Sequence, residues 1–317
     1  MRGTARIPAR CAADAAAGEL FWTGKDDFEM TNAIEIRGLV KTYPGFRLGP
    51  IDLTLPGGCI LGLIGENGAG KSTLIRLILD MTARDSGDVS VLGHDNRAQF
   101  RQVKEEIGVV FDEAGVPACL SAVQFGQVLQ SAYGRWSQDA YTALLERLGV
   151  PQKKPFSELS RGNKMKVSIA AALAHDAKLL LLDEPTNGLD PVVREEIVEL
   201  FSEFTRDASH SVLISSHIVS DLEKICDYAA FLHAGRLLLC EEKDRLLERC
   251  GVVHGTEAQL AALDPAAVLG LRHIGYGAEA LVEREKVPAG MEITPVGLED
   301  IFVFMVKDAR GPDRVQA

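Results

Sequence analysis

The sequence predicts an α/β fold built on a parallel sheet. Short apolar runs alternate along the chain with amphipathic segments, the pattern expected when strands and helices take turns. Runs such as Ile60–Ile64 and Leu179–Leu182 are apolar throughout, as strands buried on both faces are. No window offers about 18 consecutive apolar residues, so we expect no membrane-spanning helix.

The composition is that of a folded protein with room for one large domain and a small second one. Of the 317 residues, 46% are apolar and 25% are charged, which is typical of globular chains. A net charge of −11 argues against a general nucleic-acid-binding protein, because neutralising phosphates requires a basic face. None of the six cysteines forms a C-x-x-C pair, so we expect reduced thiols in a cytosolic protein.

The beginning of the chain differs from the rest. Residues 1–29 have no clear period, and Asp14 interrupts Cys11–Leu20, the only candidate for the apolar part of a signal peptide. The alternating pattern of a half-buried strand starts at Ile34. We therefore expect a disordered extension over residues 1–29 and a folded domain from Met30, which is a candidate natural start.

Strand and helix patterns follow in order through a domain predicted to span residues 30–250. We expect strands at 34–40, 60–64, 107–111, 179–182 and 212–215, and helices at 72–80, 139–148 and 193–204. Helical signals dominate between the third and fourth of these strands. Residues 112–175 are therefore predicted to form a helical subdomain.

A second boundary is expected near Gly251. Residues 251–317 carry short elements separated by glycine and proline, and we predict a small C-terminal α+β domain there. It ends in a helix with one apolar face. The residues of that face are Leu298, Ile301, Phe302, Met305 and Val306. Packing within the C-terminal domain is favoured over docking of a partner.

The most specific motif lies at residues 65–73. Gly65-Glu66-Asn67-Gly68-Ala69-Gly70-Lys71-Ser72-Thr73 fits G-x-x-x-x-G-K-[ST] and lies between a strand and a helix pattern, as a phosphate-binding loop requires. Glycines let backbone N–H groups surround phosphate oxygens, and the following helix presents its positive end. Lys71 can reach the β- and γ-phosphates, and Ser72 offers magnesium a hydroxyl.

Two acidic residues end the apolar run at Leu179–Leu182. In a parallel sheet, ligands bind where the strands end. Asp183 can therefore hold magnesium, directly or through water. Glu184 is a candidate general base toward the attacking water. The alternative interpretation is a strand that simply ends in solvated acids.

Further motifs stand in a fixed order around these two: Leu159-Ser160-Arg161-Gly162-Asn163, Asn187-Gly188-Leu189-Asp190 and His217. Together they resemble the ATPase subunit of an ATP-binding cassette (ABC) transporter, over about residues 33–245. The resemblance implies a P-loop NTPase fold of the ABC-ATPase type, with a helical subdomain and a small C-terminal α+β appendage. It also implies ATP as substrate and Mg²⁺ as cofactor.

The resemblance implies a role for each matching residue. Glu184 corresponds to the catalytic carboxylate, and His217 to the histidine that contacts the γ-phosphate and orients the nucleophile. Tyr43 corresponds to an aromatic residue that stacks on adenine, and Asp190 to a loop that crosses a dimer interface. The residues implied to bind nucleotide are Tyr43, Gly65, Asn67, Gly68, Ala69, Gly70, Lys71, Ser72, Thr73, Ser160, Gly162, Asn163 and Asp190, and those implied to hold Mg²⁺ are Ser72, Asp112 and Asp183.

Ser160–Asn163 resembles the family's signature loop. A helix is expected to begin after Ser160, which can cap its N-terminus, and such a terminus attracts anions. In the family this loop meets ATP bound to a second subunit. The resemblance therefore implies a head-to-tail dimer, homo- or heteromeric, with two ATP molecules between its subunits.

Two segments depart from the family pattern. Asp112 stands where glutamine is usual; it can still offer magnesium an oxygen, but it adds negative charge near the phosphates. In the signature, Arg161 replaces a usual glycine and Asn163 a usual glutamine. Ser160 and Gly162 remain, so we expect the signature to sense the γ-phosphate. For Arg161 we expect only a solvated charge.

The resemblance implies an ATP-hydrolysing subunit at the cytoplasmic face of the membrane, powering transport through a separate transmembrane permease. A groove near residues 112–160 would receive a short cytoplasmic helix of that permease. The residues of the segment Pro295–Phe302 and of the phosphate loop resemble those of ATPases from the bacterial antibiotic and multidrug export branch. No nucleic-acid partner is expected.

Two alternatives stay open. The first is a soluble ABC ATPase acting on the ribosome or on DNA, although the chain has one cassette and no long coiled-coil insertion. The second is an ATP-gated clamp with little hydrolysis. The presence of both Glu184 and His217 argues against a degenerate site.

Overall fold

The computed structural model describes residues 32–112, 115–275, 277–288 and 290–309. By its internal contacts, the described part of the chain falls within one compact unit, Thr31–Ala317. The predicted extension over residues 1–29 lies outside the described residues. Where the folded part divides internally stays a prediction.

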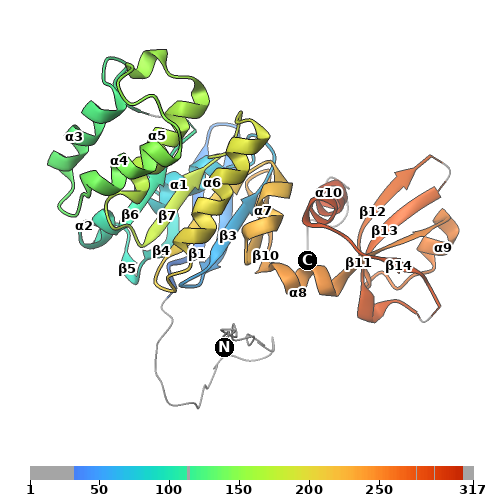
Figure 1. Cartoon of the computed structure of the whole chain (residues 1–317). Helices are drawn as coiled ribbons and strands as arrows, with labels where there is room; N and C mark the ends of the chain where they lie inside the picture. The colour runs from blue at the N-terminus through green and yellow to red at the C-terminus, as the bar shows by residue number, and fades with distance from the viewer. Residues whose placement is uncertain (1–31, 113–114, 276, 289, 310–317) are drawn as a thin grey trace, which may run out of the picture. The chain divides into compact units, whose positions relative to one another are not determined.

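A six-stranded sheet forms the centre of the fold, in the order β10-β9-β3-β8-β7-β6 (Figure 1). Its strands are β3 (Ile60–Ile64), β6 (Ile107–Val110), β7 (Leu179–Asp183), β8 (Ser211–Ser216), β9 (Tyr228–His233) and β10 (Arg236–Glu242). All neighbours pair in parallel except β9 and β10. The predicted α/β fold with a parallel sheet is confirmed.

The apolar runs are continuous because both faces of this sheet are covered. Along β7, Leu179 and Leu181 face one core, and Leu180 and Leu182 face another. This follows from the strand period of two. All five residues of β7 are buried.

An antiparallel sheet and one helix cover the first face. The sheet has the order β2-β1-β4-β5. Its strands are β1 (Ile34–Tyr43), β2 (Phe46–Leu55), β4 (Ser86–Val91) and β5 (His94–Asp95), and the helix is α1 (Lys71–Ile78). Residues from both share one core with Leu61, Leu181 and Leu213 of the central sheet.

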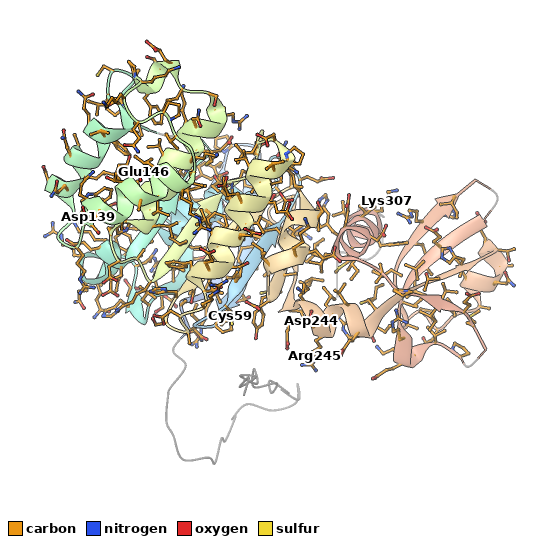
Figure 2. All side chains as sticks on the ribbon, viewed as in Figure 1. Cys59, Asp139, Glu146, Asp244, Arg245 and Lys307 are labelled. Carbon is orange, nitrogen blue, oxygen red and sulfur yellow. The ribbon has the colours of Figure 1, made fainter. Side chains whose placement is uncertain are left out.

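Helices cover the second face. They are α5 (Arg161–Leu173), α6 (Pro191–Phe204) and α7 (Val219–Ile225), and their residues Met165, Ile197 and Leu222 pack in the second core. Residues 112–175 hold α3 (Ala122–Ala132), α4 (Gln138–Arg147) and α5, and the described part of this range holds no strand. In α4, Asp139 and Glu146, labelled in Figure 2, are exposed, whereas Tyr141 and Leu145 are buried.

A four-stranded antiparallel sheet with the order β12-β13-β11-β14 follows. Its strands are β11 (Cys250–Gly255), β12 (Val268–Ile274), β13 (Gly277–Glu283) and β14 (Ile293–Thr294). The helices of this part of the chain are α8 (Lys243–Arg249), α9 (Glu257–Ala261) and α10 (Leu298–Ala309). The remaining short elements are α2 (Phe100–Val103) and the 3-10 turns Lys104–Glu106, Phe156–Glu158 and Arg284–Lys286.

Helix α10 packs on two regions. It lies against β12 of the C-terminal sheet and against α7. The Phe302 ring meets the ring of Phe231 in β9 edge-on, with centroids 5.4 Å apart. The backbone N–H of Leu298 donates to Glu223 Oε2 of α7 at 3.3 Å. The predicted apolar face therefore packs on the main sheet, and the helix also lies against β12 of the C-terminal sheet.

Within the described ranges, no helix is both long enough and apolar enough to cross a membrane.

Candidate functional site

The register of the central sheet brings the candidate residues to one edge. The Cα partners at that edge are Val110 with Leu182, Asp183 with Ser215, and Ile64 with Ser216. Gly65, Asp112, Glu184 and His217 lie one or two residues beyond these positions. Residues far apart in the sequence therefore follow neighbouring strands at their carboxyl ends, where open α/β sheets bind ligands.

The loop between β3 and α1 requires glycine at both ends. A Cβ on Gly65 would lie 2.5 Å from the carbonyl oxygen of Leu232, and one on Gly70 would lie 2.9 Å from Leu48 Cδ1. Gly70 also has φ 111° and precedes α1 without any side-chain cap. Side chains therefore leave the positive end of α1 open to an anion.

Lys71 lies folded over this loop and is 5% exposed. Its Nζ donates to the carbonyl oxygen of Gly65 at 2.7 Å and pairs with Glu184 Oε1 at 3.0 Å. The structure thus brings together the phosphate loop and the predicted catalytic carboxylate. A buried ammonium beside carbonyl oxygens is a ready partner for a phosphate.

The Glu184 carboxylate also contacts His217. Nδ1 of His217 donates to Glu184 Oε2 at 2.7 Å, and the backbone N–H of His217 lies 3.3 Å from the same oxygen. Glu184 has φ 51°, in the left-handed region that non-glycine residues rarely adopt. One carboxylate is therefore held between Lys71 and His217.

Ser215 positions the two acids, and the sequence analysis missed it. Its Oγ donates to Asp183 Oδ1 at 2.7 Å and accepts from the backbone N–H of Glu184 at 3.1 Å. Its side chain is fully buried. A serine that ends an apolar strand just before His217 was the available signal.

The predicted magnesium ligands Ser72, Asp112 and Asp183 are all oxygen donors, which suits a hard cation. In the part of the chain that the structure describes, no three His, Cys, Asp or Glu side chains form a group that could hold a metal. The protein residues therefore fit Mg²⁺ only as a partial set. Phosphate oxygens and water would complete it, as is usual for Mg²⁺ with nucleotides.

Two aromatic residues lie in the hairpin between β1 and β2. Tyr43 is 37% exposed, and Lys41 Nζ lies 5.4 Å from its ring centroid. Phe46, its Cα partner, was not singled out from the sequence. Its Cζ would lie 3.0 Å from a Cβ on Gly70, so Phe46 is the aromatic side chain beside the phosphate loop.

The hydrogen bonds of two signature-region residues are local helix caps. Ser160 caps α5 by accepting the backbone N–H of Asn163 at 3.2 Å, and Asp190 caps α6 by accepting that of Val193 at 3.1 Å. Among the described residues, no hydrogen bond of Ser160, Asn163 or Asp190 reaches residues 65–73.

Arg161, expected to be only a solvated charge, has a partner. Its Nη2 donates to Oδ1 of Asp112, and the two side chains are 53% and 40% exposed. The two departures from the family pattern are therefore in contact.

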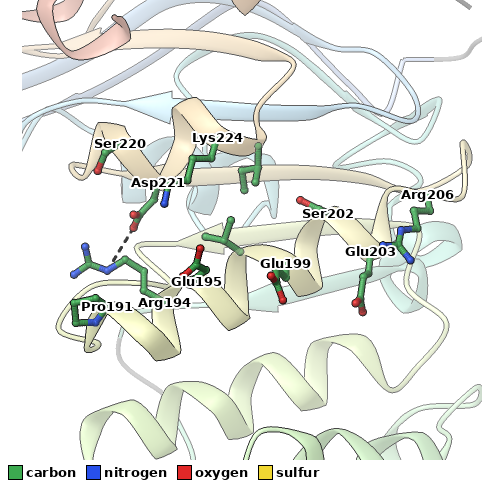
Figure 3. Close-up of a pocket in the computed structure, with 12 residues that line it drawn as sticks. Pro191, Arg194, Glu195, Glu199, Ser202, Glu203, Arg206, Ser220, Asp221 and Lys224 are labelled. Carbon is green, nitrogen blue, oxygen red and sulfur yellow. Dashed lines mark ion pairs between the residues drawn. The ribbon is translucent and has the colours of Figure 1, made fainter. Parts of the chain in front are cut away.

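A groove of about 700 Å³ lies between α6 and α7 (Figure 3). Arg194 spans it, with Nε 3.6 Å from Asp221 Oδ2 and Nη2 donating to the carbonyl oxygen of Leu189 at 3.2 Å. None of the predicted site residues lines the groove. Arg194 instead ties the segment before α6 to the helix that follows His217.

Comparison with known proteins agrees with this geometry. The sequence profile of a family described as ABC transporter matches residues 48–187. The bacitracin transport ATP-binding protein BcrA of Enterococcus faecalis is 33% identical over 212 residues, which cover 66% of this chain and 69% of that protein. The Nod factor export ATP-binding protein I of Rhizobium leguminosarum bv. viciae is 34% identical over 225 residues, covering 68% and 71%.

Among solved structures, an ATP-binding subunit of an ABC transporter is similar with a TM-score of 0.60 and 26% identity. The similarity covers 68% of this chain and 91% of that one.

Proposed function

The chain belongs to the ABC transporter family, as an ATP-binding subunit that hydrolyses ATP, and we propose that it powers export through a separate transmembrane permease. The observation that carries the proposal is the arrangement of Lys71, Glu184 and His217 at the sheet edge. The relative named for Nod factor export supports export as the direction.

In the proposed mechanism, Lys71 exchanges its contact with Glu184 for the β- and γ-phosphates of ATP. The released carboxylate then polarises the water that attacks the γ-phosphate, while His217 keeps it oriented through the 2.7 Å hydrogen bond. Mg²⁺ supplies charge neutralisation at the phosphates when bound. Ser72, Asp112 and Asp183 are the residues that would hold it.

The remaining proposed nucleotide contacts come from the hairpin and from a second subunit. The exposed Tyr43 ring offers a face to adenine. Ser160, Gly162, Asn163 and Asp190 would meet the nucleotide of a partner ATPase subunit, identical or different. Support comes from the N-terminus of the 13-residue helix α5, whose first turn carries no acidic side chain.

An apolar cavity of about 400 Å³ is the proposed seat for the permease. Leu79, Met81, Phe100, Phe111 and Tyr133 are among its lining residues. Met81 is 62% exposed, which suits a partner's apolar helix. Eight of the ten lining residues precede Asp112 in the sequence, so the proposed groove lies mostly outside the expected range of 112–160. Binding there would place the chain at the cytoplasmic face of the membrane.

The test is purification of the tagged chain from gently solubilised membranes of its native cell. We expect a stoichiometric polytopic membrane protein to accompany it. Met81→Glu should reduce that recovery, and Leu271→Glu, at a 43% exposed apolar residue of β12, should leave it unchanged. Recovery in the soluble fraction with ribosomes or DNA-processing proteins would overturn the transporter role but not the ATPase chemistry.

A further inference from the structure

The two segments that depart from the family pattern are joined by one ion pair. Asp112 and Arg161 are 49 residues apart in the sequence. Asp112 follows β6, and Arg161 is the first residue of α5. Nη2 of Arg161 donates to Oδ1 of Asp112. The contact therefore links the end of a central strand to the start of the signature helix.

Asp112 lies at the catalytic edge of the sheet. Val110 and Leu182 are Cα partners in β6 and β7. Asp112 and Glu184 each stand two residues beyond these partners. A carboxylate at this place brings a negative charge next to the position where the phosphates are proposed to bind. The usual glutamine would bring none.

Arg161 is placed by more than the carboxylate. A Cβ on Gly188 would lie 3.3 Å from Nη1 and 3.5 Å from Cζ of Arg161, so the guanidinium lies against the loop before α6. Oδ2 of Asp112 has no hydrogen bond or ion pair within the described residues. Arg161 thus holds one oxygen of the carboxylate.

The pair contributes little to folding, because both side chains are about half exposed and ion pairs in such positions stabilise proteins weakly. Its effect is local: a fixed positive charge neutralises Asp112 and orients it. The pair is therefore better explained by a role in the functional site than by a contribution to stability.

We propose that Arg161 is a positioning residue that acts through Asp112 and thereby sets how strongly nucleotide binding depends on Mg²⁺. With Arg161 in place, Asp112 repels the phosphates less and is less available to a cation. This proposal rests on the proposed function, since it needs the nucleotide to bind at residues 65–73.

The test compares the affinity for AMP-PNP, a non-hydrolysable ATP analogue, with Mg²⁺ and with EDTA, measured by calorimetry. The readout is the ratio of the two affinities. Arg161→Gln should raise this ratio about two- to fivefold, the range that a half-exposed ion pair allows. Binding with EDTA should weaken, because the bare carboxylate repels the phosphates.

Asp112→Asn should lower the ratio, because it removes the carboxylate. In the Asp112→Asn background, Arg161→Gln should have no further effect on the ratio, since Arg161 acts through Asp112. Arg161→Lys should keep the ratio near that of the unaltered chain. Arg147→Gln breaks a comparable pair with Glu203, whose side chains are 43% and 37% exposed, and should leave the ratio unchanged.

An unchanged ratio in Arg161→Gln, an equal loss of affinity in both conditions, or a similar effect of Arg147→Gln would each overturn the proposal. A further loss of affinity in the Asp112→Asn background would also overturn it, because Arg161 would then bind phosphate itself. If the unaltered chain fails to bind AMP-PNP, or Lys71→Ala binds it equally well, the proposed function fails instead.

Discussion

The strands of the nucleotide-binding core and those of the C-terminal sheet differ in how completely they are buried. Every residue of β3, β7 and β8 is buried, and these strands pair in parallel. In the antiparallel C-terminal sheet, β12 has one buried residue, Gly270. The core strands therefore lie between two covered faces, whereas the outer strand β12 of the C-terminal sheet stays partly exposed to water.

Their charged groups differ as well. In the core, Lys71 and Glu184 are paired with only 6% and 10% of their side chains exposed. In the C-terminal region, Arg272 pairs with Glu279, and Arg249 pairs with Glu283, at side-chain exposures between 11% and 34%. Buried charges are costly unless something requires them. This difference supports the proposal that the core pair is kept for a ligand, whereas the C-terminal pairs join neighbouring elements at the surface.

The sharpest test compares two equally buried glutamates. Glu184 and Glu279 are both 8% exposed. Glu184→Gln should lower ATP turnover by roughly 10²–10⁴-fold, because the general base is lost. Glu279→Gln should leave turnover intact. Phosphate release measures both, and an equal loss in the two variants would remove the distinction between the regions.

The next test uses a substitution that should lower folding stability and leave nucleotide binding unchanged. Phe304 of α10 is fully buried, and Arg272 stacks over its ring at 4.6 Å. Phe304→Ala should lower the free energy of unfolding by about 3–5 kcal/mol, because it leaves a cavity. Affinity for AMP-PNP should not change. Denaturant unfolding and calorimetry measure the two effects, with the exposed Leu271→Ala as control; a matching loss of affinity would contradict the comparison.

A third test compares two buried lysines of the core. Lys71 is 5% and Lys166 is 9% exposed, and Lys166 Nζ donates to the carbonyl oxygen of Leu148 at 2.6 Å. Lys71→Ala should weaken AMP-PNP binding about 10- to 100-fold, the value of a charge-assisted contact. Lys166→Ala should affect stability only. Undiminished affinity in Lys71→Ala would remove the phosphate role.

The smallest effect is expected on acidification. A hydrogen bond from Lys286 and the charge of Arg249 lower the pKa of Glu283 below its usual 4.5. The unfolded chain therefore binds this proton more readily than the folded chain does. The stabilisation is present above about pH 4.5 and is lost as the pH falls through the lower pKa of the folded state.

We expect a loss below about 1 kcal/mol for such a pair. Thermal unfolding from pH 7 to pH 3 measures it, with Glu283→Gln as reference. If the unaltered chain and this variant lose equal stability over that range, Glu283 has no part in the pH dependence.

The sequence predicted strands β3, β6, β7 and β8 of the central sheet, because ligand chemistry and burial both limit the residues there, whereas β9 and β10 were not predicted. The strand expected at Ile60–Ile64 is β3 to the residue, and the helix expected after Ser160 is α5. Strand β2 was missed, because Gly49 and Pro50 interrupt its pattern. The strands of the C-terminal sheet were not separately predicted, because they are short and partly exposed and so lack a strong period.

The candidate site shows the same limit. The phosphate loop, the two acids and His217 are visible because they stand in local motifs. Ser215 supports them from a neighbouring strand, and Arg161 reaches Asp112 across 49 residues. Such contacts depend on the register between neighbouring strands and on where the helices pack, and a local sequence pattern predicts neither.

The double attachment of α10 has a consequence for synthesis. Chains leave the ribosome from the N-terminus, and domains fold as they emerge. Of the described elements, α10 emerges last, so β9 and α7 must fold before Phe302 can cover Phe231 and before Leu298 can bond Glu223. Until then an apolar face stays open to water, and a transcript that stops short of Leu298 would yield a core that is a target for chaperones and proteases.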